Sequence, residues 1–573
     1  MSKFYYNENQ SSFDAIVVGS GISGGWATKE LCERGLKTLL LERGRMIKHI
    51  EDYTTAHMDP WDIENNGTPT PAQLERQHKQ KRTGYTVSRY HSHFFVDDID
   101  HPYNEEEGCR FDWMRGYHVG GRSLQWGRQS YRWSDIAFEA NKKDGVGVDW
   151  PVRYKDIEPW YTKVEEHIGV SGEALGLEQL PDSKFLPMME LNSPEKALRK
   201  AAMEKLGITI TAGRTAHITG DKQFEGRTKC QFRNRCMRGC PFGGYFSSQS
   251  STLPAAVKTG NLTLRVDSIV SEVLYDEKTG KASGVKIIDR ETKEEIVYEA
   301  KVVFLCASAI ASAAILLNSK SERFPNGLGN DSDQLGRNIM DHHLGVGAGG
   351  VIEGYEDEYY KGRRPNGIYI PQFQNLPGDK KKRTYLRGFG YQGGASRSNY
   401  QSIIAEYAYG KDLKDAILKP GQWSIGIGGF GEILPHPENR MYLDYDKKDQ
   451  WGLPTVTFTT KFRENEYKMR EEMKSAAVEI LEAAGVKNVR GYDNPNSHGI
   501  GLGIHEMGTA RMGHDPKTSV VNKYNQVHTC KNVFMTDGAF MTSANCVNPS
   551  LTYMAFSARA ANYAADQIEK GLL

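Results

Sequence analysis

The sequence lacks the features that identify several classes of protein. None of its apolar runs approaches the roughly 20 residues that a membrane-spanning helix requires. Residues 1–14 are polar and contain no hydrophobic core of a secretory signal. The formal net charge is only +1, so no general attraction to nucleic acid or anionic membranes is expected. There are no internal repeats and no low-complexity linker. What remains is a chain of 573 residues, long enough for a large core and more than one lobe.

The eight cysteines do not form the dense framework of a small disulfide-bonded domain. Cys32 and Cys306 lie in apolar patterns, where packing is their expected role. Cys230, Cys236 and Cys240 instead lie within eleven residues, and a proline follows the last of them. Such runs hold iron–sulfur clusters. Three thiols suit a cluster that lacks one iron, or a zinc site completed by a histidine. The third interpretation is three buried or unpaired thiols that act as small hydrophobic side chains.

The N-terminal region has the pattern of a nucleotide-binding unit. A predicted buried strand over 13–19 leads into a turn with Gly19, Gly21 and Gly24, and a helix is predicted over 26–34. The glycines permit a tight turn and let a pyrophosphate approach the N-terminus of the helix. The sequence therefore predicts a dinucleotide site at this turn.

The next predicted strand, 38–42, ends in Glu42, where an acid can accept a hydrogen bond from a ribose hydroxyl. Arg43 follows it. A solvated charge is a commoner role for such an arginine than reading the phosphate of NADP, and we count it among the residues near the cofactor. A second glycine-rich segment, 118–127, is either a turn or a place where backbone reaches a flat cofactor.

The rest of the chain alternates between strand-like and helix-like patterns. Residues 50–110 suggest long loops, and residues 345–460 alternate apolar and polar positions, which predicts an antiparallel sheet and a second lobe. Strands are predicted over 261–273, 282–288 and 298–308. Helices are predicted over 149–169, 190–206, 309–318, 462–484 and 551–569.

Two polar residues near the C-terminus could carry out alcohol oxidation. His505 precedes a glycine-rich segment, and Asn548 precedes Pro549. A histidine can take a hydroxyl proton because its pKa lies near neutrality. An asparagine can donate a hydrogen bond to the same oxygen. A structural hydrogen bond is the more ordinary role for any one of the sixteen histidines.

Several motifs in order resemble the glucose–methanol–choline (GMC) oxidoreductases over nearly the whole chain. The first is the N-terminal glycine fingerprint with its terminal acid. The others are residues 120–127, 307–317 and 335–342, the His505 segment, Asp537-Gly538 and Asn548-Pro549. The resemblance implies an FAD-dependent enzyme of α/β class, α+β overall. Its FAD-binding domain is Rossmann-like, and its substrate domain is an antiparallel sheet with helices.

The resemblance also implies domain boundaries and site residues. We expect the FAD-binding domain, with the cysteine segment, at 1–140, 205–345 and 500–573, and the substrate domain at 141–204 and 346–499. His505 and Asn548 are the expected catalytic pair, and Gln125 joins them in binding the substrate. Cofactor contacts are expected from Gly19, Gly21, Gly24, Glu42, Arg43, Gly120, Gly121, Ser123, Gly127, Val270, Ala307, Asp537, Gly538, Asn548 and Pro549.

The pair of His505 and Asn548 resembles the pyranose oxidase and gluconate dehydrogenase branch of the family. Pyranose oxidase attaches its flavin to a histidine where this chain has Gln125, so FAD should be bound non-covalently. The cysteine run resembles that of bacterial sugar dehydrogenases, in which three such cysteines hold a [3Fe–4S] cluster. Electrons then pass to a cytochrome or another acceptor, which makes dioxygen an unexpected acceptor.

The same resemblance implies a substrate, a partner and a location. Oxidation of glucosides at C3 is the expected reaction, with gluconate C2 or glucose C1 as alternatives and an aromatic or steroid alcohol as a lesser one. A non-catalytic flavoprotein subunit and a true oxidase are the remaining classes. Related subunits are exported with a small partner that carries a twin-arginine signal, so the periplasm is the expected location. The cytoplasm is the alternative.

Overall fold

The computed structural model describes residues 3–7, 10–84, 86–358, 364–397, 409–418 and 421–573. Parts of the polar N-terminal segment and of the predicted antiparallel region therefore lie outside the described residues. Within the described part, no helix is both long and apolar enough to cross a membrane.

A mostly parallel sheet forms the first half of the molecule. Its parallel strands, in order across the sheet, are β6 (Leu262–Arg265), β3 (Thr38–Leu41), β2 (Phe13–Val18), β9 (Glu295–Leu305) and β18 (Cys530–Met535). These strands are almost wholly buried near their carboxyl ends, as expected for a parallel sheet covered on both faces. The edges carry β1 (Phe4–Tyr5) and β17 (Gln526–Val527), and the hairpin β7 (Ser268–Asp276) and β8 (Lys281–Asp289) joins β9.

Helices cover this sheet. The first, α1 (Ile22–Glu33), follows the glycine turn and packs against α11 (Ser550–Glu569), which in turn packs against α5 (Tyr154–Ile168). The apolar helix α8 (Ala309–Asn318) begins directly after β9. Helix α7 (Thr252–Lys258) packs against α1, and the chain also forms the short helices α2 (Pro71–Arg76), α3 (Asp135–Phe138) and α4 (Ala140–Asp144).

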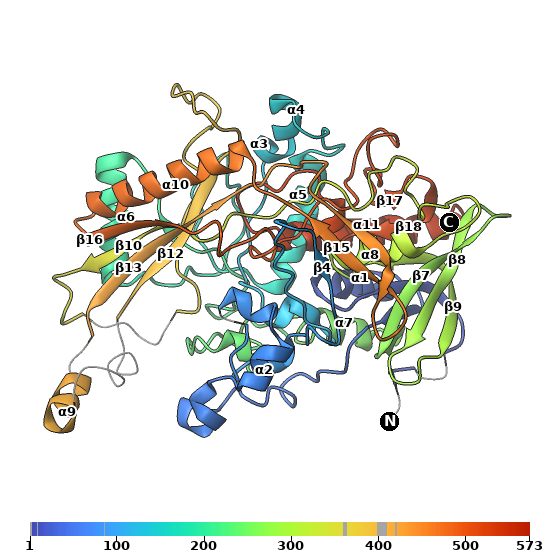
Figure 1. The fold of residues 1–573 in the computed structure, drawn as a ribbon, viewed down its shortest axis with the longest axis horizontal. Helices are drawn as coiled ribbons and strands as arrows, with labels where there is room; N and C mark the ends of the chain where they lie inside the picture. The colour runs from blue at the N-terminus through green and yellow to red at the C-terminus, as the bar shows by residue number, and fades with distance from the viewer. Residues whose placement is uncertain (1–2, 8–9, 85, 359–363, 398–408, 419–420) are drawn as a thin grey trace.

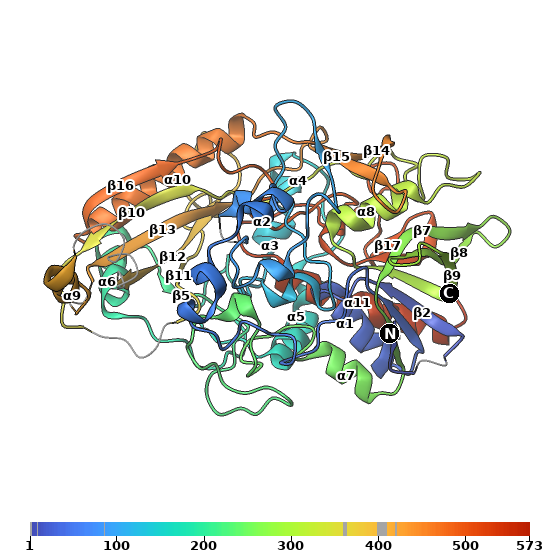
Figure 2. The same ribbon diagram turned by 60° about the horizontal axis from the view of Figure 1, so that its bottom comes forward.

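A second, antiparallel sheet lies at the opposite end of the molecule (Figures 1 and 2). Its order is β16 (Lys487–Asp493), β10 (Val346–Ile352), β13 (Trp423–Gly431), β12 (Phe389–Arg397), β11 (Ile368–Ile370) and β5 (Thr211–Ala212). The long helix α10 (Glu464–Ala483) covers one face, and α6 (Ser193–Leu206) packs beside it. The helix α9 (Gly410–Leu418) buries none of its residues. The predicted two-part α/β architecture is confirmed.

A small third sheet joins segments that are far apart in the chain. Strands β14 (Arg440–Lys448) and β15 (Pro454–Thr459) pair with β4 (Asn104–Glu105), and their apolar side chains pack in the same core as the parallel sheet. Helix α5 also packs in that core, whereas β5 belongs to the second sheet. Sheet pairing therefore joins segments that the boundaries predicted at 141–204, 205–345 and 346–499 assign to different domains, and those boundaries stay a prediction.

Candidate active site

A cavity of about 480 Å³ lies between the two halves of the molecule. The residues that end β2, β3, β9 and β18 line it on one side, and Gln392 of β12 and Phe430 of β13 line it on the other. Ligands in parallel α/β sheets bind outside the carboxyl ends of the strands. This cavity is in that position.

The glycine turn forms one end of the cavity. Gly19 has φ +94°, and a side chain there would meet the backbone of Cys306, the residue that follows β9. A Cβ atom at Gly24 would lie 1.8 Å from the Gly19 carbonyl oxygen, so only glycine lets α1 start so close to β2. Gly21 differs, because a Cβ atom there meets no protein atom within 4 Å and Gly21 lines the cavity. The space beside Gly21 is thus open for a ligand.

Glu42 is held at the end of β3 by three hydrogen bonds. Its carboxylate accepts from the backbone N–H of Ser20 at 3.1 Å, from the Ser20 hydroxyl at 2.5 Å and from the Gly44 N–H at 3.0 Å. Burial raises the pKa of Glu42 above its ordinary value. The carboxyl group therefore fixes the turn as well as lining the cavity.

The Arg43 side chain is partly exposed and has several partners within the protein. It forms an ion pair with Asp449 at 3.5 Å, and its guanidinium lies 4.7 Å from the ring centre of Tyr117 and 5.4 Å from that of Trp451. These contacts fix Arg43 at the wall of the cavity.

The structure brings most of the remaining expected site residues to the same cavity. The lining includes Gly19, Gly21, Glu42, Arg43, Gly121, Ser123, Gln125, Gly127, Val270, Ala307, His505, Asp537, Gly538 and Asn548. Three expected residues do not line it: Gly24 packs α1 on β2, Gly120 donates its N–H to the Ser20 hydroxyl at 2.9 Å, and Pro549 precedes α11.

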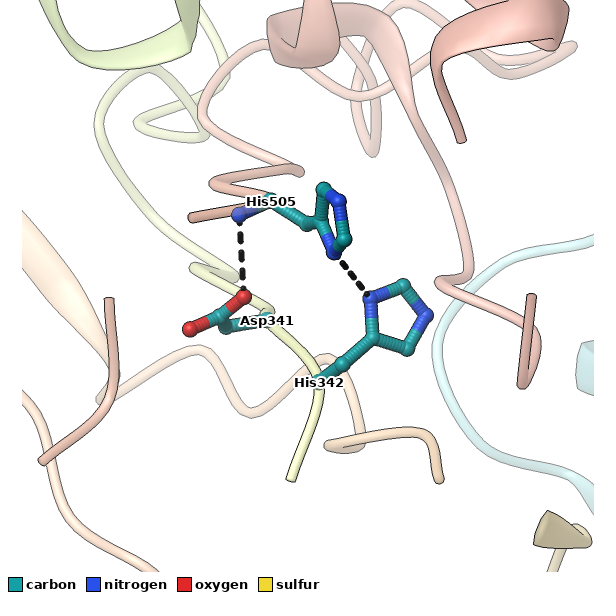
Figure 3. Close-up of side chains that lie close together, drawn as sticks. All are labelled: Asp341, His342 and His505. Atoms are coloured by element: carbon teal, nitrogen blue, oxygen red, sulfur yellow. Dashed lines mark hydrogen bonds between the residues drawn. The ribbon is translucent and has the colours of Figure 1, made fainter. Parts of the chain in front are cut away.

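His505 and His342 form a hydrogen-bonded pair of imidazoles at the other end of the cavity (Figure 3). Their Nδ1 atoms are 3.1 Å apart. The other ring nitrogen of His342, Nε2, lies 3.2 Å from the Ala544 carbonyl and 3.0 Å from the Asn545 carbonyl. Burial lowers the pKa of His342 to about 3 and that of His505 well below 6.5. Both rings are therefore neutral at pH 7.

Asp341 holds the backbone beside His505. Its carboxyl group accepts from the N–H groups of Gly501 at 2.7 Å, Gly503 at 2.9 Å and His505 at 3.1 Å. Within this segment Ile504 has φ +59°, a costly conformation for a β-branched residue. Burial raises the pKa of Asp341 to about 7. The three bonds hold a strained backbone that aims the His505 ring.

Asp341, His342 and His505 also offer possible metal-ligand atoms within 4.8 Å of one another. The hydrogen bonds already occupy those atoms. The carboxyl group serves three backbone donors, and the two Nδ1 atoms serve each other. Hydrogen bonding alone accounts for their closeness.

Asn548 is positioned from the second sheet. Its Oδ1 accepts a hydrogen bond of 2.6 Å from Nε2 of Gln392 on β12. Tyr391, the preceding residue, donates its hydroxyl to a carbonyl of α10, so Gln392 points to the opposite face of the strand. That face turns Gln392 toward the cavity.

The polar atoms of the lining fit a bound dinucleotide. Both amide atoms of Gln125 and the hydroxyl of Tyr553 are buried without a hydrogen-bond partner among the described residues, and both side chains line the cavity. Buried polar groups normally have partners. These atoms and the open space at Gly21 are suited to FAD.

The cysteine segment lies directly against the glycine-rich loop of the cavity. The Tyr245 hydroxyl is 2.6 Å from the Leu124 carbonyl and 3.1 Å from the Cys236 carbonyl, and so joins the two segments. Met237, the neighbour of Cys236, lines the cavity itself. The three thiols are thus next to the nucleotide site.

The three thiols have positively charged and polar neighbours. Cys230, Cys236 and Cys240 are half-buried, and burial raises the pKa of Cys230 to about 12. Burial also raises the pKa of Cys236, and the positive charge of Arg128 partly opposes that rise. Buried donors without a partner among the described residues also lie near the thiols: Arg128 Nε, Arg227 Nη2 and His217 Nδ1. Positive charge and free donors favour bound thiolates.

Two family models described as GMC oxidoreductase match residues 13–344 and 435–557. The chain belongs to the GMC oxidoreductase family. It is an FAD-dependent oxidoreductase that acts on CH–OH groups, in agreement with the expectation from its motifs.

Curated relatives of this GMC oxidoreductase are sugar and alcohol enzymes. The fructose dehydrogenase large subunit of Gluconobacter japonicus is 28% identical, with 99% of this chain and 100% of that protein covered. The gluconate 2-dehydrogenase flavoprotein of Pantoea cypripedii is 24% identical, over 94% and 91%. The C-glycoside 3-oxidase of Microbacterium trichothecenolyticum is 24% identical, over 54% and 55%.

Solved structures show the same fold. The pyridoxine 4-oxidase from Mesorbium loti aligns with a TM-score of 0.60 at 16% identity, covering 96% of this chain and 98% of that one. The formate oxidase of Aspergillus oryzae RIB40 aligns with a TM-score of 0.61 at 14% identity, covering 98% and 99%.

Two residues of the site were not assigned a role from the sequence. His342 ends a family-like segment, but nothing in that segment indicates its contact with His505. Gln392 lies in a strand with no recognisable motif. Their roles depend on contacts between segments that are 163 and 156 residues apart in the chain, respectively.

Proposed function

We propose that this GMC oxidoreductase is a sugar dehydrogenase that oxidises a ring hydroxyl, with C3 of glucosides as the first candidate and 3-keto glucosides as products. One observation carries the proposal. His505 and Asn548 line the same cavity as the nucleotide turn, each with one polar atom left for a substrate.

FAD would be held by the glycine turn, Glu42 and the segment around Gly121 and Asp537, and when bound it supplies the acceptor for the hydride. Gln125 stands where a covalent link would need a histidine, which supports non-covalent binding. Its unpartnered amide is available for a polar contact with the cofactor or the substrate.

The two side chains of the catalytic pair act on different atoms of the hydroxyl group. Nε2 of His505 takes the hydroxyl proton as the carbon gives up its hydrogen with the bonding electrons. Nδ2 of Asn548 donates to the same oxygen and stabilises the charge that develops there. General-base assistance of this kind typically accelerates a reaction roughly 10²–10⁴-fold.

Two kinds of relative support a sugar hydroxyl and differ on its position. The C-glycoside 3-oxidases, as their name says, favour C3, although they align with only about half of the chain. The gluconate 2-dehydrogenase flavoprotein aligns almost throughout and favours C2, and the fructose dehydrogenase large subunit, which also aligns almost throughout, favours a sugar without naming a position. Gluconate 2-dehydrogenase or glucose 1-dehydrogenase activity is therefore the second candidate.

The cysteine segment supports a dehydrogenase rather than an oxidase. We assign Cys230, Cys236 and Cys240 to a [3Fe–4S] cluster, which when bound supplies a one-electron carrier toward an external acceptor such as a cytochrome. The hydrogen bonds of the Tyr245 hydroxyl to the Leu124 and Cys236 carbonyls support this assignment, because they join the cysteine segment to the glycine-rich segment 118–127.

A partner subunit and export with it complete the proposal. Two relatives bear the names of a large subunit and a flavoprotein, which suggests assembly with a small subunit. Periplasmic location through that subunit's signal is the corresponding proposal. Fractionation of the native host and identification of any small subunit that co-purifies with this chain would test both.

The test of the reaction is product identification. Purified protein is incubated anaerobically with methyl glucoside, fructose or gluconate and a one-electron dye, and the products are assigned by NMR. A 3-keto glucoside supports the proposal. Turnover of fructose or gluconate without turnover of methyl glucoside would support the second candidate instead. Bound FAD without turnover of any alcohol would indicate a non-catalytic flavoprotein subunit.

A further inference from the structure

We infer that His342 and Gln392 are positioning residues. His342 fixes which ring nitrogen of His505 carries the proton, and Gln392 fixes which end of the Asn548 amide faces the cavity. Each uses one hydrogen bond to hold a catalytic side chain so that His505 presents a bare nitrogen and Asn548 presents an N–H. The inference rests on the proposed oxidation of an alcohol at this site.

The positions of the protons on His342 and His505 follow from the carbonyl groups around His342. The carbonyl oxygens of Ala544 and Asn545 can only accept, so Nε2 of His342 must carry its proton. A neutral imidazole has one N–H, which leaves Nδ1 of His342 as an acceptor. The 3.1 Å contact between the two Nδ1 atoms then requires the proton to be on Nδ1 of His505.

The consequence for His505 is a defined tautomer. Its single proton faces His342, and Nε2 keeps a free lone pair. Nε2 makes no hydrogen bond among the described residues, and His505 lines the cavity. A base that takes a hydroxyl proton needs such a bare nitrogen. The buried ring of His342, stacked on Phe430 at 4.4 Å, cannot turn easily to offer a donor instead.

The role of Gln392 concerns the amide of Asn548. Nε2 of Gln392 donates to Oδ1 of Asn548 at 2.6 Å, so the acceptor end of the Asn548 amide is occupied. The NH₂ group is left for the cavity, since no described residue accepts from it. The oxygen of a substrate hydroxyl thus meets the N–H donor of Asn548, and its proton meets the acceptor nitrogen of His505. Oxidation of an alcohol needs this arrangement of donor and acceptor.

The central experiment compares two variants of His342. His342→Leu removes the acceptor, whereas His342→Gln can still donate toward Ala544 and accept from His505. We expect His342→Leu to bind FAD normally and to reduce the rate of anaerobic flavin reduction by sugar at least tenfold, with little change in sugar KM. His342→Gln should recover most of the rate. His343→Gln, at the neighbouring buried histidine, controls for loss of an imidazole from this segment.

A second readout does not depend on turnover. In protein labelled with ¹⁵N-histidine, the His505 signals, assigned by their loss in His505→Gln, should show a protonated Nδ1 and a bare Nε2. The pattern should change in His342→Leu. A wild-type His505 protonated on Nε2, or a His342→Leu variant as fast as wild type, would overturn the inference. If none of the alcohols tested reduces the flavin of the wild-type protein, the proposed function fails instead. The NMR result still decides the tautomer of His505.

Gln392 has its own pair of variants. Gln392→Glu leaves only acceptors beside Asn548 and should turn its amide, raising the KM for sugar and slowing flavin reduction several-fold. Gln392→Leu removes the bond without imposing the wrong polarity and should have a smaller effect. Equal kinetics in wild type and Gln392→Glu would contradict the role of Gln392.

Discussion

The two ends of the cavity are constructed in different ways. The nucleotide end is local in sequence, because β2, the glycine turn and the start of α1 follow one another within residues 13–33. The catalytic end draws His342, Gln392, His505 and Asn548 from four separate segments, and side-chain hydrogen bonds hold them together.

The difference reflects what each end has to do. Backbone N–H groups at a helix N-terminus bind phosphate without any choice of protonation state. The catalytic end has to present one bare nitrogen and one N–H group to the same oxygen, and only side-chain partners can decide that. Changes at the first end should therefore alter cofactor binding, and changes at the second should alter the rate while FAD stays bound.

The largest effect is expected at Gly24. In Gly24→Ala the new Cβ atom would lie 1.8 Å from the Gly19 carbonyl oxygen, which must displace α1 from β2. We expect loss of bound FAD together with a lower melting temperature. The matched variant is Gly21→Ala, whose Cβ atom meets no protein atom within 4 Å but enters the cavity. It should keep the melting temperature of the apoprotein and weaken FAD binding at least tenfold. Equal FAD affinity in Gly21→Ala and wild type would contradict the claim that the cofactor binds against the glycine turn.

Removal of the base should have the next largest effect. His505→Ala should retain FAD, since the glycine turn is unchanged, and should slow anaerobic flavin reduction by about 10²–10⁴-fold. Stopped-flow absorbance of the flavin measures this directly. His514→Ala, an exposed histidine in the same region, is the control. A wild-type rate of flavin reduction in His505→Ala would show that His505 is not the base.

The cysteine segment should separate the two half-reactions. Cys236→Ala should reduce its flavin with sugar at nearly the wild-type rate but lose most cytochrome reduction, together with iron and labile sulfide. Cys109→Ala, a buried cysteine outside the segment, should lose neither. Unchanged cytochrome reduction in Cys236→Ala would exclude an electron path through these thiols.

The smallest effect is a pH profile that stays flat. Burial lowers the pKa of His505 well below 6.5, so its base form persists as the pH falls. A histidine with the ordinary pKa of about 6.5 would lose about tenfold between pH 8 and pH 5.5. We expect flavin reduction to change much less than that over this range. A tenfold fall centred near pH 6.5 would show that His505 is not buried in this way.

The groups around His505 agree with this expectation. Burial keeps the His342 ring neutral, and Arg122 and Glu506 pair with each other at 2.7 Å. Asp341, whose pKa burial raises to about 7, accepts from the backbone and not from the ring.

Local patterns predicted much of the fold. The predicted helices at 309–318, 462–484 and 551–569 correspond to α8, α10 and α11 within two residues at each end. The predicted strand over 261–273 is two strands, because Asp267 adopts φ +51° between them.

Non-local pairing limited the rest. No local pattern predicted that β15 pairs with β4, which lies more than 350 residues earlier in the chain. His505 and Asn548 were recognisable from their motifs, whereas the contacts of His342 and Gln392 with them arise only when distant segments meet. A hydrogen bond between side chains on separate elements leaves no periodic trace in the sequence.

The most direct test of the central claim is an anaerobic titration of the purified protein with methyl glucoside, fructose and gluconate, followed by the absorbance of the flavin. The account predicts that at least one sugar bleaches the flavin band in wild type and fails to do so on the same time scale in His505→Ala. An FAD-loaded wild-type protein that none of these sugars and no simple alcohol can bleach would contradict it.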